Sequence, residues 1–413
     1  MPHVLFYSNH LRGPKGAAGA RSWHQARCLS EIFDVTVVIP GVDPVTAEPV
    51  TEETYEGLDL DRVRVIRLRV ATNDRSSVLR RALYFLSAMT AQLRAGFTTR
   101  RPDVVLSMSL PITQLMVAAL VAAVRRVPLI VDLRDMPFET AAEVGYIRSR
   151  PIVGLLRWLE TRMLAQARVI LTNSPYYKRY LCERGLDGGR IHVAAIGYDD
   201  FDEPPMEQIR LWRQRMLAAF GECPPEFVGV YAGTLGYAFP IDAILRAGAL
   251  LRDDPAVGLV FLGDGQRLEE YRRYAQEHGI RAKFLGRVRK LDVHAACRAA
   301  DFCIYPASPG KFSGAILGNK VFDYLGAHKS IIYVGGPSAV ADVITQLQAG
   351  ILCADGAPEE FARAVTALRS DAARRQRLEQ GAAGFRAAGY TARAAAERLR
   401  ELVNGMLPEP VHS

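Results

Sequence analysis

Short apolar segments alternate with longer amphipathic segments along most of the chain. In the first half, segments rich in Val and Ile end in polar or turn-forming residues, which is typical of buried parallel strands. We predict strands at 3–8, 35–40, 62–68, 103–108, 128–133, 168–173 and 192–197, and helices at 21–32, 78–97, 112–125, 153–166 and 175–185. Such alternation predicts a parallel sheet with right-handed crossovers.

The pattern begins again after the segment YDDFDEPP (198–205), whose acidic and proline residues predict an interdomain linker. Strands are predicted at 227–233, 257–263, 283–286, 302–306, 330–335 and 351–353, and helices at 241–253, 267–279, 291–299, 319–327, 338–348, 358–369, 371–386 and 391–406. The length of 413 residues also exceeds what one hydrophobic core usually holds. We therefore predict an α/β protein with two Rossmann-like domains facing across a cleft, 1–200 and 201–390. We expect a C-terminal helix and tail, 391–413, to pack back on the first domain.

The composition narrows the class of protein. Hydrophobic residues make up 49% of the chain and charged residues 23%, as in ordinary soluble proteins. The six cysteines include no CxxC pair, and no signal peptide is evident, so we expect a reduced, cytoplasmic chain. The net charge of +8 suits nucleic acid, anionic lipid or a phosphorylated small molecule. Because the arginines are not clustered with aromatic residues, we expect no nucleic-acid partner.

Two apolar helices raise the question of a membrane. The segment 78–97 has an apolar side with arginines at 80, 81, 94, 100 and 101 in or beside it. It is either a surface helix packed on its own domain or an amphipathic helix lying on an acidic membrane face, which would make the protein peripheral at the inner face. The apolar stretch 111–124 is too short to span a bilayer, and we predict a buried crossover helix there.

Two loops in the first half carry candidate chemistry. Residues 9–20 contain Gly13, Gly16 and Gly19 between a strand and a helix, where backbone N–H groups can approach a phosphate. The loop does not match GxGxxG, which argues against a dinucleotide fingerprint, and it is otherwise a flexible surface loop. Residues 132–145 place Asp132, Arg134, Asp135 and Glu139 beyond the end of a buried strand. α/β domains put active-site groups there, although a capped loop gives the same pattern.

Five segments of the second half resemble, in order and spacing, the donor domain of family 4 GT-B glycosyltransferases. They are YAGTLG (231–236), FLGDGQRLEEY (261–271), FLGRV (284–288), AADFCIYP (299–306) and NKVFDYLG (319–326). In the first half, IVDLRDMPFETAAEVG (130–145) and the final IGYDDF (196–201) resemble the N-acetylfucosamine transferase-like branch. The resemblance covers about residues 3 to 405.

The resemblance implies transfer of a hexosyl or N-acetylhexosaminyl group from a nucleotide diphosphate sugar. A UDP-sugar is favoured over a GDP-sugar, and the reaction is expected to retain configuration without metal or cofactor. The acceptor, a hydroxyl or other nucleophile, would belong to a lipid-linked saccharide or a small molecule in bacterial polysaccharide or natural-product biosynthesis. The alternatives are a catalytically impaired nucleotide-sugar-binding subunit and a nucleotide-sugar epimerase. The oligomeric state stays open.

The resemblance also assigns candidate residues. Asp323 stands where the family holds the ribose, and Lys320 is the candidate for the diphosphate. The other donor-side candidates are backbone or polar groups near them: Gly16, Gly19, Thr234, Gly236, Arg287, Lys311, Gly318 and Asn319. On the acceptor side, Asp135 and Glu139 are the candidates for acceptor contact or proton handling, with His24 and Arg134 nearby.

The chain departs from the family at two points of the donor site. Family members usually carry two glutamates seven residues apart, but this chain has no glutamate between Glu277 and Glu359, and Asp323 takes the second position. Thr234 replaces an arginine that clamps the diphosphate, and a hydroxyl is a weaker donor than a guanidinium. We therefore expect Lys320, Lys311 or Arg12 to contact the phosphates.

Overall fold

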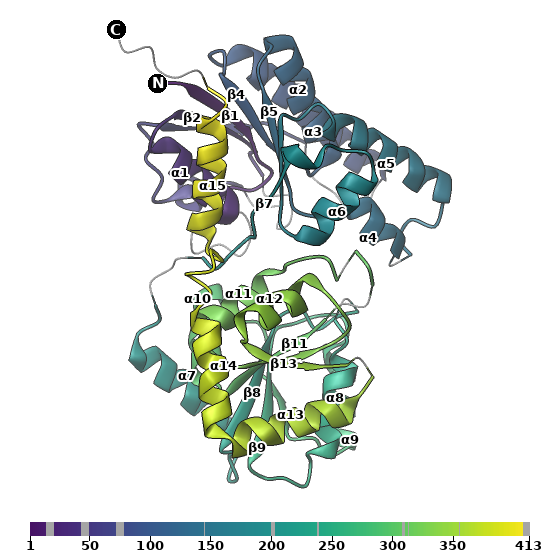
Figure 1. The fold of residues 1–413 in the computed structure, drawn as a ribbon, viewed down its shortest axis with the longest axis vertical. Coiled ribbons are helices and arrows are strands. Elements are labelled where there is room, and N and C mark those ends of the chain that lie inside the picture. The colour runs from purple at the N-terminus through teal and green to yellow at the C-terminus, as the bar shows by residue number, and fades with distance from the viewer. Residues whose placement is uncertain are drawn as a thin grey trace. The chain divides into compact units, whose positions relative to one another are not determined.

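The computed structural model describes residues 1–13, 20–42, 49–71, 78–143, 145–199, 203–237, 239–307, 310–312, 314–354 and 356–407. The chain divides into two compact units. Unit 1 comprises Met1–Asp199 and Ala392–Ser413, and unit 2 comprises Asp200–Thr391. Each unit is an α/β domain built on one parallel sheet (Figure 1), as the alternating sequence pattern predicts.

Unit 1 contains a seven-stranded sheet in the order β3-β2-β1-β4-β5-β6-β7. The strands are β1 (His3–Tyr7), β2 (Asp34–Pro40), β3 (Val63–Leu68), β4 (Val104–Met108), β5 (Leu129–Leu133), β6 (Val169–Thr172) and β7 (Ile191–Val193). All the pairings between them are parallel, for example with Val4 beside Val35 and Val104. The central strands are buried on both faces, which explains why they read as continuous apolar runs in the sequence.

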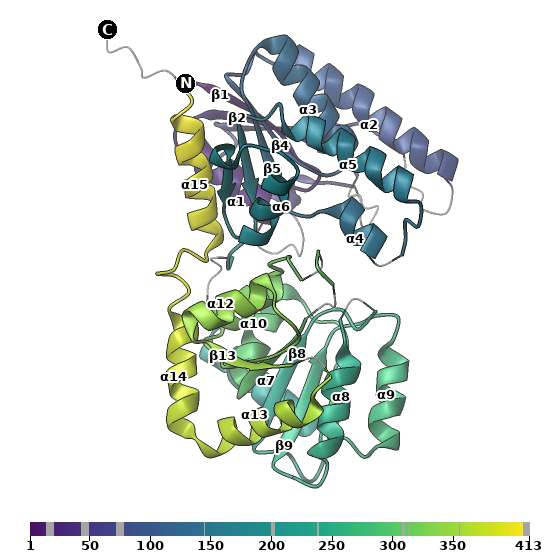
Figure 2. The same cartoon turned by 45° about the vertical axis from the view of Figure 1, so that its right-hand side comes forward.

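Helices cover both faces of this sheet. α1 (Ala20–Ser30) and α15 (Ala392–Asn404) pack together, and Leu399 and Val403 of α15 join the same core as Val4 and Phe6. The C-terminal helix therefore belongs to the core of unit 1. On the other face, α2 (Val78–Thr98), α3 (Ile112–Arg125) and α5 (Arg150–Leu164) lie side by side (Figure 2). The remaining helical elements are η1 (Glu52–Tyr55), α4 (Pro137–Glu143), α6 (Pro175–Glu183) and η2 (Gly188–Arg190).

Unit 2 contains a six-stranded parallel sheet in the order β10-β9-β8-β11-β12-β13. The strands are β8 (Phe227–Ala232), β9 (Val257–Leu262), β10 (Ala282–Phe284), β11 (Phe302–Pro306), β12 (Ile331–Val334) and β13 (Gly350–Cys353). The helices are α7 (Met206–Ala218), α8 (Ile241–Leu250), α9 (Leu268–Glu277), α10 (Lys290–Ala299), α11 (Asn319–Gly326), α12 (Ala339–Leu347), α13 (Pro358–Ser370) and α14 (Ala372–Ala383). The chain order reverses at β8, which pairs with β9 on one side and β11 on the other. Ligands of open α/β sheets bind at such a reversal.

Two helices add to what the sequence predicts. The helix predicted at 112–125 is α3, which buries one side, whereas Leu120 and Val124 on its other side are half exposed. The pattern also gives no prediction of α7, because this helix is mostly polar and buries little beyond Trp212 and Met216. Among the described helices, none combines the length and the apolar character needed to cross a bilayer.

Candidate functional site

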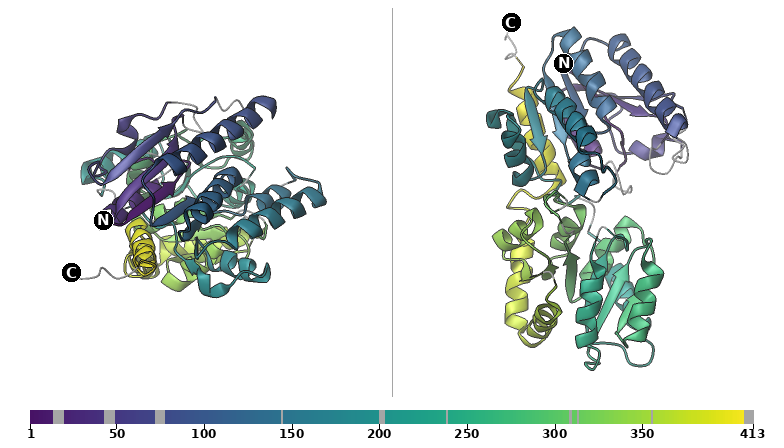
Figure 3. Two further views of the ribbon diagram at one scale, coloured as in Figure 1. Left: turned by 90° about the horizontal axis from the view of Figure 1, so that it is seen from above. Right: turned by 90° about the vertical axis from the view of Figure 1, so that its right-hand side faces the viewer.

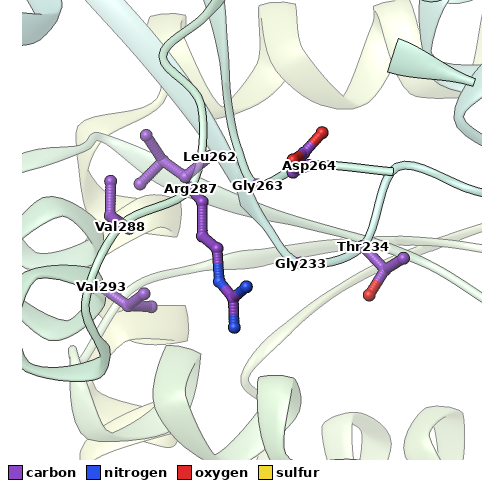
Figure 4. A pocket seen from close by; sticks show the side chains of 8 residues that line it. All are labelled: Gly233, Thr234, Leu262, Gly263, Asp264, Arg287, Val288 and Val293. Carbon is purple, nitrogen blue, oxygen red and sulfur yellow. The ribbon is translucent and has the colours of Figure 1, made fainter. Parts of the chain in front are cut away.

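A pocket opens at the carboxyl ends of β8, β9 and β10 in unit 2 (Figure 4). Its volume is about 400 Å³, and its lining is Gly233, Thr234, Leu262, Gly263, Asp264, Arg287, Val288 and Val293. All but Val293, which is on α10, come from the ends of strands or the turns that follow them. The pocket therefore lies at the carboxyl ends of the strands, where open α/β sheets bind ligands, and extends from β8 toward β10.

Two glycine turns are packed main chain against main chain beside this pocket. A Cβ atom added to Gly263 would lie 1.8 Å from the carbonyl oxygen of Gly233, and Gly263 has a φ of +146°. The N–H groups of Gly233 and Leu235 donate to the carbonyls of Leu262 and Asp264. Those of Thr234 and Gly236, by contrast, have no backbone acceptor in the described part of the chain. These two predicted positions thus offer N–H groups to a ligand.

The side chains of the pocket divide into an apolar wall and two charged groups. Val288 and Val293 form the wall, and the Arg287 guanidinium extends into the space between Gly233 and Val293 (Figure 4). Arg287 is exposed, and no described carboxylate pairs with it. The Oδ1 of Asp264 accepts a hydrogen bond from the N–H of Gly265, at 2.7 Å. The wall suits a flat ring, and the guanidinium suits an anion or a ring edge.

Lys320 lies next to the Gly233 turn, with its ammonium group buried. A Cβ added to Gly233 would lie 2.2 Å from Lys320 Cε, so only a glycine leaves room for the lysine. Lys320 Nζ lies 2.9 Å from the centroid of the Phe239 ring and 5.3 Å from that of Tyr231. It has no hydrogen-bond partner among the described residues. Desolvation lowers the pKa of Lys320 to about 7, despite the opposing charge of Asp323.

The first turn of α11 adds backbone donors beside this ammonium. Gly318 is the N-cap, in an extended conformation and without a side chain to satisfy the N–H groups of the first turn. Asn319 is exposed at the first helical position, and Lys320 follows it. A helix start and a buried, unpartnered cation together favour an anion at this point.

Asp323 is one turn further along α11 and is almost completely buried. Its Oδ1 accepts from His294 Nε2 at 3.0 Å and lies 3.1 Å from Lys290 Nζ, both on α10. Burial would raise the pKa of Asp323, but the attraction of Lys290 and the hydrogen bond from His294 outweigh it and hold the pKa below its usual value. The carboxylate is therefore charged and already bound to α10.

Lys311 and a small cavity lie in the segment that leads to α11. Lys311 is exposed, and its Nζ lies 5.7 Å from the centroid of the Phe312 ring, so a phosphate contact is not preformed there. A cavity of about 80 Å³ has a mainly apolar lining of Phe239, Tyr305, Ala307, Gly314, Ile316, Gly318, Ser338 and Val340. Phe239 both lines this cavity and covers the Lys320 ammonium, so the cavity lies beside the lysine.

In unit 1, Asp132 is the centre of a buried network. Arg21 donates two hydrogen bonds to its carboxylate, at 2.8 and 2.9 Å, and Gln25 donates a third at 2.9 Å. Burial opposes the charge, but Arg21 and Arg134 lower the pKa of Asp132 to about 2. Arg21 also donates to the carbonyls of Ala194 and Ala195. These bonds join β5, α1 and the segment after β7, which gives Asp132 a structural role.

Arg134 and Asp135 follow at the carboxyl end of β5. Desolvation lowers the pKa of Arg134 to about 10 although Asp132 counteracts it, and the guanidinium reaches Ser22 Oγ at 3.3 Å. Asp135 is half-buried and has no hydrogen-bond partner among the described residues. Burial raises the pKa of Asp135, while Arg134 lowers it. Asp135 is thus a desolvated carboxylate that is available to a ligand.

Glu139 is held differently from Asp135, although both follow the same strand. Its Oε1 accepts from Tyr180 at 2.8 Å and from Arg157 at 3.1 Å, and lies 3.6 Å from Arg184. The residue is buried. These contacts favour a structural role for Glu139, which joins α4 to α5 and α6.

The remaining predicted positions are His24, Gly16 and Gly19. His24 Nε2 lies 3.3 Å from Asp199 Oδ1, with its ring edge-on to Trp23. Gly16 and Gly19 lie outside the described residues. Within the described ranges, no group of three or more His, Cys, Asp or Glu side chains is arranged to hold a metal ion.

Two solved structures share the fold of this chain. Sucrose-phosphate synthase from Thermosynechococcus elongatus has the same fold, with a TM-score of 0.71, 14% identity and coverage of 98% of this chain and 99% of that one. HepE from Anabaena in complex with UDP gives a TM-score of 0.70 with 16% identity, over 98% of this chain and 100% of HepE. A search of curated protein sequences gives no match.

The two halves of the chain also match two families of domains. Residues 16–197 match the glycosyl transferase 4-like domain, and residues 226–371 match glycosyl transferases group 1. The chain belongs to the GT-B glycosyltransferases. The prediction of a GT-B glycosyltransferase is thereby confirmed. The 400 Å³ pocket of this glycosyltransferase lies within its group 1 domain.

Several residues of the site were not predicted from the sequence of this glycosyltransferase. Asp264 and Val293 line the pocket, Phe239 covers the Lys320 ammonium, and Lys290 and His294 hold Asp323. The FLGDG turn was a visible signal for Asp264, because it repeats the glycine turn after β8. His294 lies on the helix predicted at 291–299, and the observed α10 begins one residue earlier, at Lys290. Residues four apart share one face of a helix, but only the fold places that face against α11.

Proposed function

We propose that this glycosyltransferase transfers a hexosyl or N-acetylhexosaminyl group from a UDP-sugar to an acceptor hydroxyl or another nucleophile. We further propose that configuration is retained and that no metal ion takes part. The observation that carries the proposal is the buried Lys320 ammonium, which has no hydrogen-bond acceptor among the described residues and lies beside a pocket lined partly by backbone. A diphosphate would supply the missing acceptor. The preference for uracil rests on HepE, whose structures hold UDP and UDP-glucose.

The donor would extend from the pocket to the start of α11. The base would lie on the Val288–Val293 wall, next to Arg287. We assign the diphosphate to Lys320, with help from the N–H groups of Thr234 and the first turn of α11. The sugar would then approach the small cavity beyond Phe239. A pre-desolvated cation at the leaving diphosphate is most effective as negative charge develops there.

We propose that Asp323 binds the ribose and that contacts from α10 hold its carboxylate in place. Because Lys290 and His294 both contact Oδ1, the ribose hydroxyls would approach Oδ2. On the acceptor side, Asp135 would orient the acceptor hydroxyl, while an oxygen of the donor phosphate takes its proton. Arg134 and His24 remain predicted acceptor-side groups.

Binding and turnover should be tested separately. Calorimetric titration with UDP, GDP, UMP and uridine measures the base and phosphate preferences, and release of UDP from a panel of UDP-sugars, with and without acceptors, measures turnover. We expect UDP to bind at least about tenfold more tightly than UMP, because the second phosphate reaches Lys320. Absence of binding by any nucleoside diphosphate would falsify the donor assignment.

The ribose contact has its own test. Wild-type protein should prefer UDP to 2′-deoxy-UDP, and Asp323→Asn should lose this preference. If Asp323 is only structural, the Asn variant will melt at a lower temperature but keep the wild-type ratio of the two affinities.

A catalytically impaired nucleotide-sugar-binding subunit is the second candidate. It is favoured by the absence of glutamate between Glu277 and Glu359 and by Thr234 in place of the usual arginine. It predicts UDP-sugar binding without turnover on any acceptor. An epimerase on the same fold would instead consume the donor without any acceptor and yield an epimeric UDP-sugar.

A further inference from the structure

Large apolar side chains are exposed on the outward surface of α2, α3 and α5, which we call the three-helix face. The three helices lie side by side on one face of the unit 1 sheet (Figures 2 and 3). Their exposed large apolar side chains are Leu83, Leu86, Phe97, Leu120, Val124, Ile152, Leu155 and Trp158. Large apolar side chains that gather on the exposed side of neighbouring helices favour a binding surface.

These exposed side chains are additional to the ones that hold the helices on the sheet. In α2, Tyr84, Ala88 and Ala95 are buried, whereas Leu83 and Leu86 turn away from them. In α5, Val153 and Leu164 are buried, whereas Leu155 and Trp158 are 62% and 56% exposed. The core therefore does not require the apolar residues of the three-helix face.

The charge on these helices has a single sign at the surface. α2 and α3 contain no acidic residue, and the one acid of α5 is Glu160. Glu160 is buried and accepts from Arg184 at 2.7 Å, so it does not contribute to the outer surface. The same three helices carry seven arginines: Arg80, Arg81, Arg94, Arg125, Arg150, Arg157 and Arg162. Exposed apolar side chains on helices whose exposed charges are all positive complement an anionic surface.

The helix α5 and the segment before it have the composition of a membrane-interface anchor. Trp158 is exposed, and the guanidinium of Arg162 lies 5.6 Å from the centroid of its ring. Tyr146, in the turn before α5, is among the most exposed aromatic side chains described. Tryptophan and tyrosine are favoured at the boundary between lipid headgroups and acyl chains, and arginine is favoured beside phosphate.

We propose that the three-helix face docks on the surface of an anionic lipid bilayer. The contact extends beyond the helix 78–97 that the sequence singled out, because it includes α3 and α5. The arginines of these helices select this occupant over a second copy of the chain, whose identical face would bring like charges together. The proposal does not depend on which donor the pocket binds.

Flotation of the full chain with vesicles tests the proposal. We expect binding to vesicles of phosphatidylcholine with 30% phosphatidylglycerol, chosen as the probe, and at least about tenfold weaker binding to pure phosphatidylcholine, because each arginine near an anionic surface contributes about fivefold. Raising the salt concentration should weaken the binding to anionic vesicles.

Matched substitutions locate the surface. Leu155→Glu combined with Trp158→Glu should weaken binding to the anionic vesicles at least about tenfold, since both apolar contacts are lost and negative charge is added. Leu211→Glu combined with Leu250→Glu adds the same charge at two leucines of unit 2 that are 56% and 53% exposed, and it should leave vesicle binding within about twofold of wild type. Both variants should keep the wild-type melting temperature and affinity for UDP.

Three results would overturn the proposal. The first is no binding of the wild-type chain to the anionic vesicles. The second is equal loss of binding in the two double variants, which would show a non-specific effect of net charge. The third is a wild-type dimer in light scattering that becomes a monomer only in the Leu155/Trp158 variant, which would make this face an interface between copies.

Discussion

Replacing Lys320 by methionine should stabilise unit 2 and weaken UDP binding at once. Methionine keeps the length and the apolar stem of the side chain but removes the charge. In the free protein the ammonium has no hydrogen-bond acceptor among the described residues, and the rings of Phe239 and Tyr231 lie beside it. The substitution therefore removes a buried charge without removing a bond.

The size of the stabilisation follows from the pKa of Lys320. Desolvation lowers this pKa from 10.5 to about 7. Each pH unit corresponds to about 1.4 kcal/mol, so the ammonium form of the folded protein is disfavoured by about 4–5 kcal/mol at most. We expect Lys320→Met to raise the free energy of unfolding of unit 2 by about 2–4 kcal/mol near pH 7. For a domain of this size, each kcal/mol raises Tm by roughly 2–4 °C.

The effect of pH has a definite sign. Because the pKa is lower in the folded than in the unfolded state, the unfolded state binds more protons between pH 7 and 10.5, and wild-type stability rises with pH there. The penalty is complete below pH 7 and absent above pH 10.5. The advantage of Lys320→Met should therefore shrink by about 2–3 kcal/mol between pH 7.5 and 9.5.

Differential scanning calorimetry with and without UDP provides the assay. The two units can unfold separately, and the transition that UDP raises identifies unit 2. Lys320→Met should shift this transition upward without UDP and lose about tenfold to a hundredfold in UDP affinity, as expected for one charge-assisted bond. Lys283→Met is the matched control, because Lys283 also lies over an aromatic ring, that of Phe220, but away from the pocket.

The reasoning is refuted if Lys320→Met lowers the transition temperature and leaves UDP affinity unchanged. That result would mean that the lysine is paired in solution and does not contact phosphate. Equal behaviour of the Lys283 variant would show that the effect follows from net charge.

Three further predictions address the same sites. UDP affinity of the wild type should fall by up to about tenfold per pH unit above pH 7, because Lys320 must take up a proton to bind phosphate; titration in buffers of different ionisation enthalpy should detect that proton, and its absence would contradict the assignment. Asp135→Asn should lower turnover at least about a hundredfold with UDP affinity unchanged, whereas Glu139→Gln should lower stability by about 3 kcal/mol; the reverse pattern in assays of UDP release and Tm would exchange their roles. Gly263→Ala should destabilise unit 2 strongly because its Cβ would meet the Gly233 carbonyl, whereas Gly236→Ala should be tolerated, which thermal melts will show.

The strands were predictable because burial on both faces leaves a continuous apolar run. Strand β11 matches its predicted range of 302–306, and β2 differs by one residue. Helices were less well predicted where packing, not composition, decides. α7 is polar along most of its length, and α4 is one short helix inside a loop that the sequence presented only as charged. In α3, apolar composition alone could not tell a core-facing residue from Leu120, which faces outward.

The candidate site shows the same division between local and long-range information. The family motif predicted Lys320 and Asp323 from local order. It could not predict that Phe239, far away in sequence, would cover the ammonium, or that α10 would hold the carboxylate. Glu139 and Asp135 have similar local settings in sequence. Only the contacts from α5 and α6 separate the tied glutamate from the available aspartate.

The departures from the family pattern also explain why one lysine would matter so much in this chain. Thr234 stands where the family is expected to hold an arginine, so unit 2 offers the Lys320 ammonium and the exposed Arg287 guanidinium to the proposed diphosphate. An aromatic ring at position 239 stabilises the ammonium weakly while no ligand is bound, and it excludes the water that would otherwise screen it. Low local dielectric strengthens the attraction of this one charge for phosphate. A single desolvated lysine can thus compensate for missing donors, at the expense of stability in the free protein.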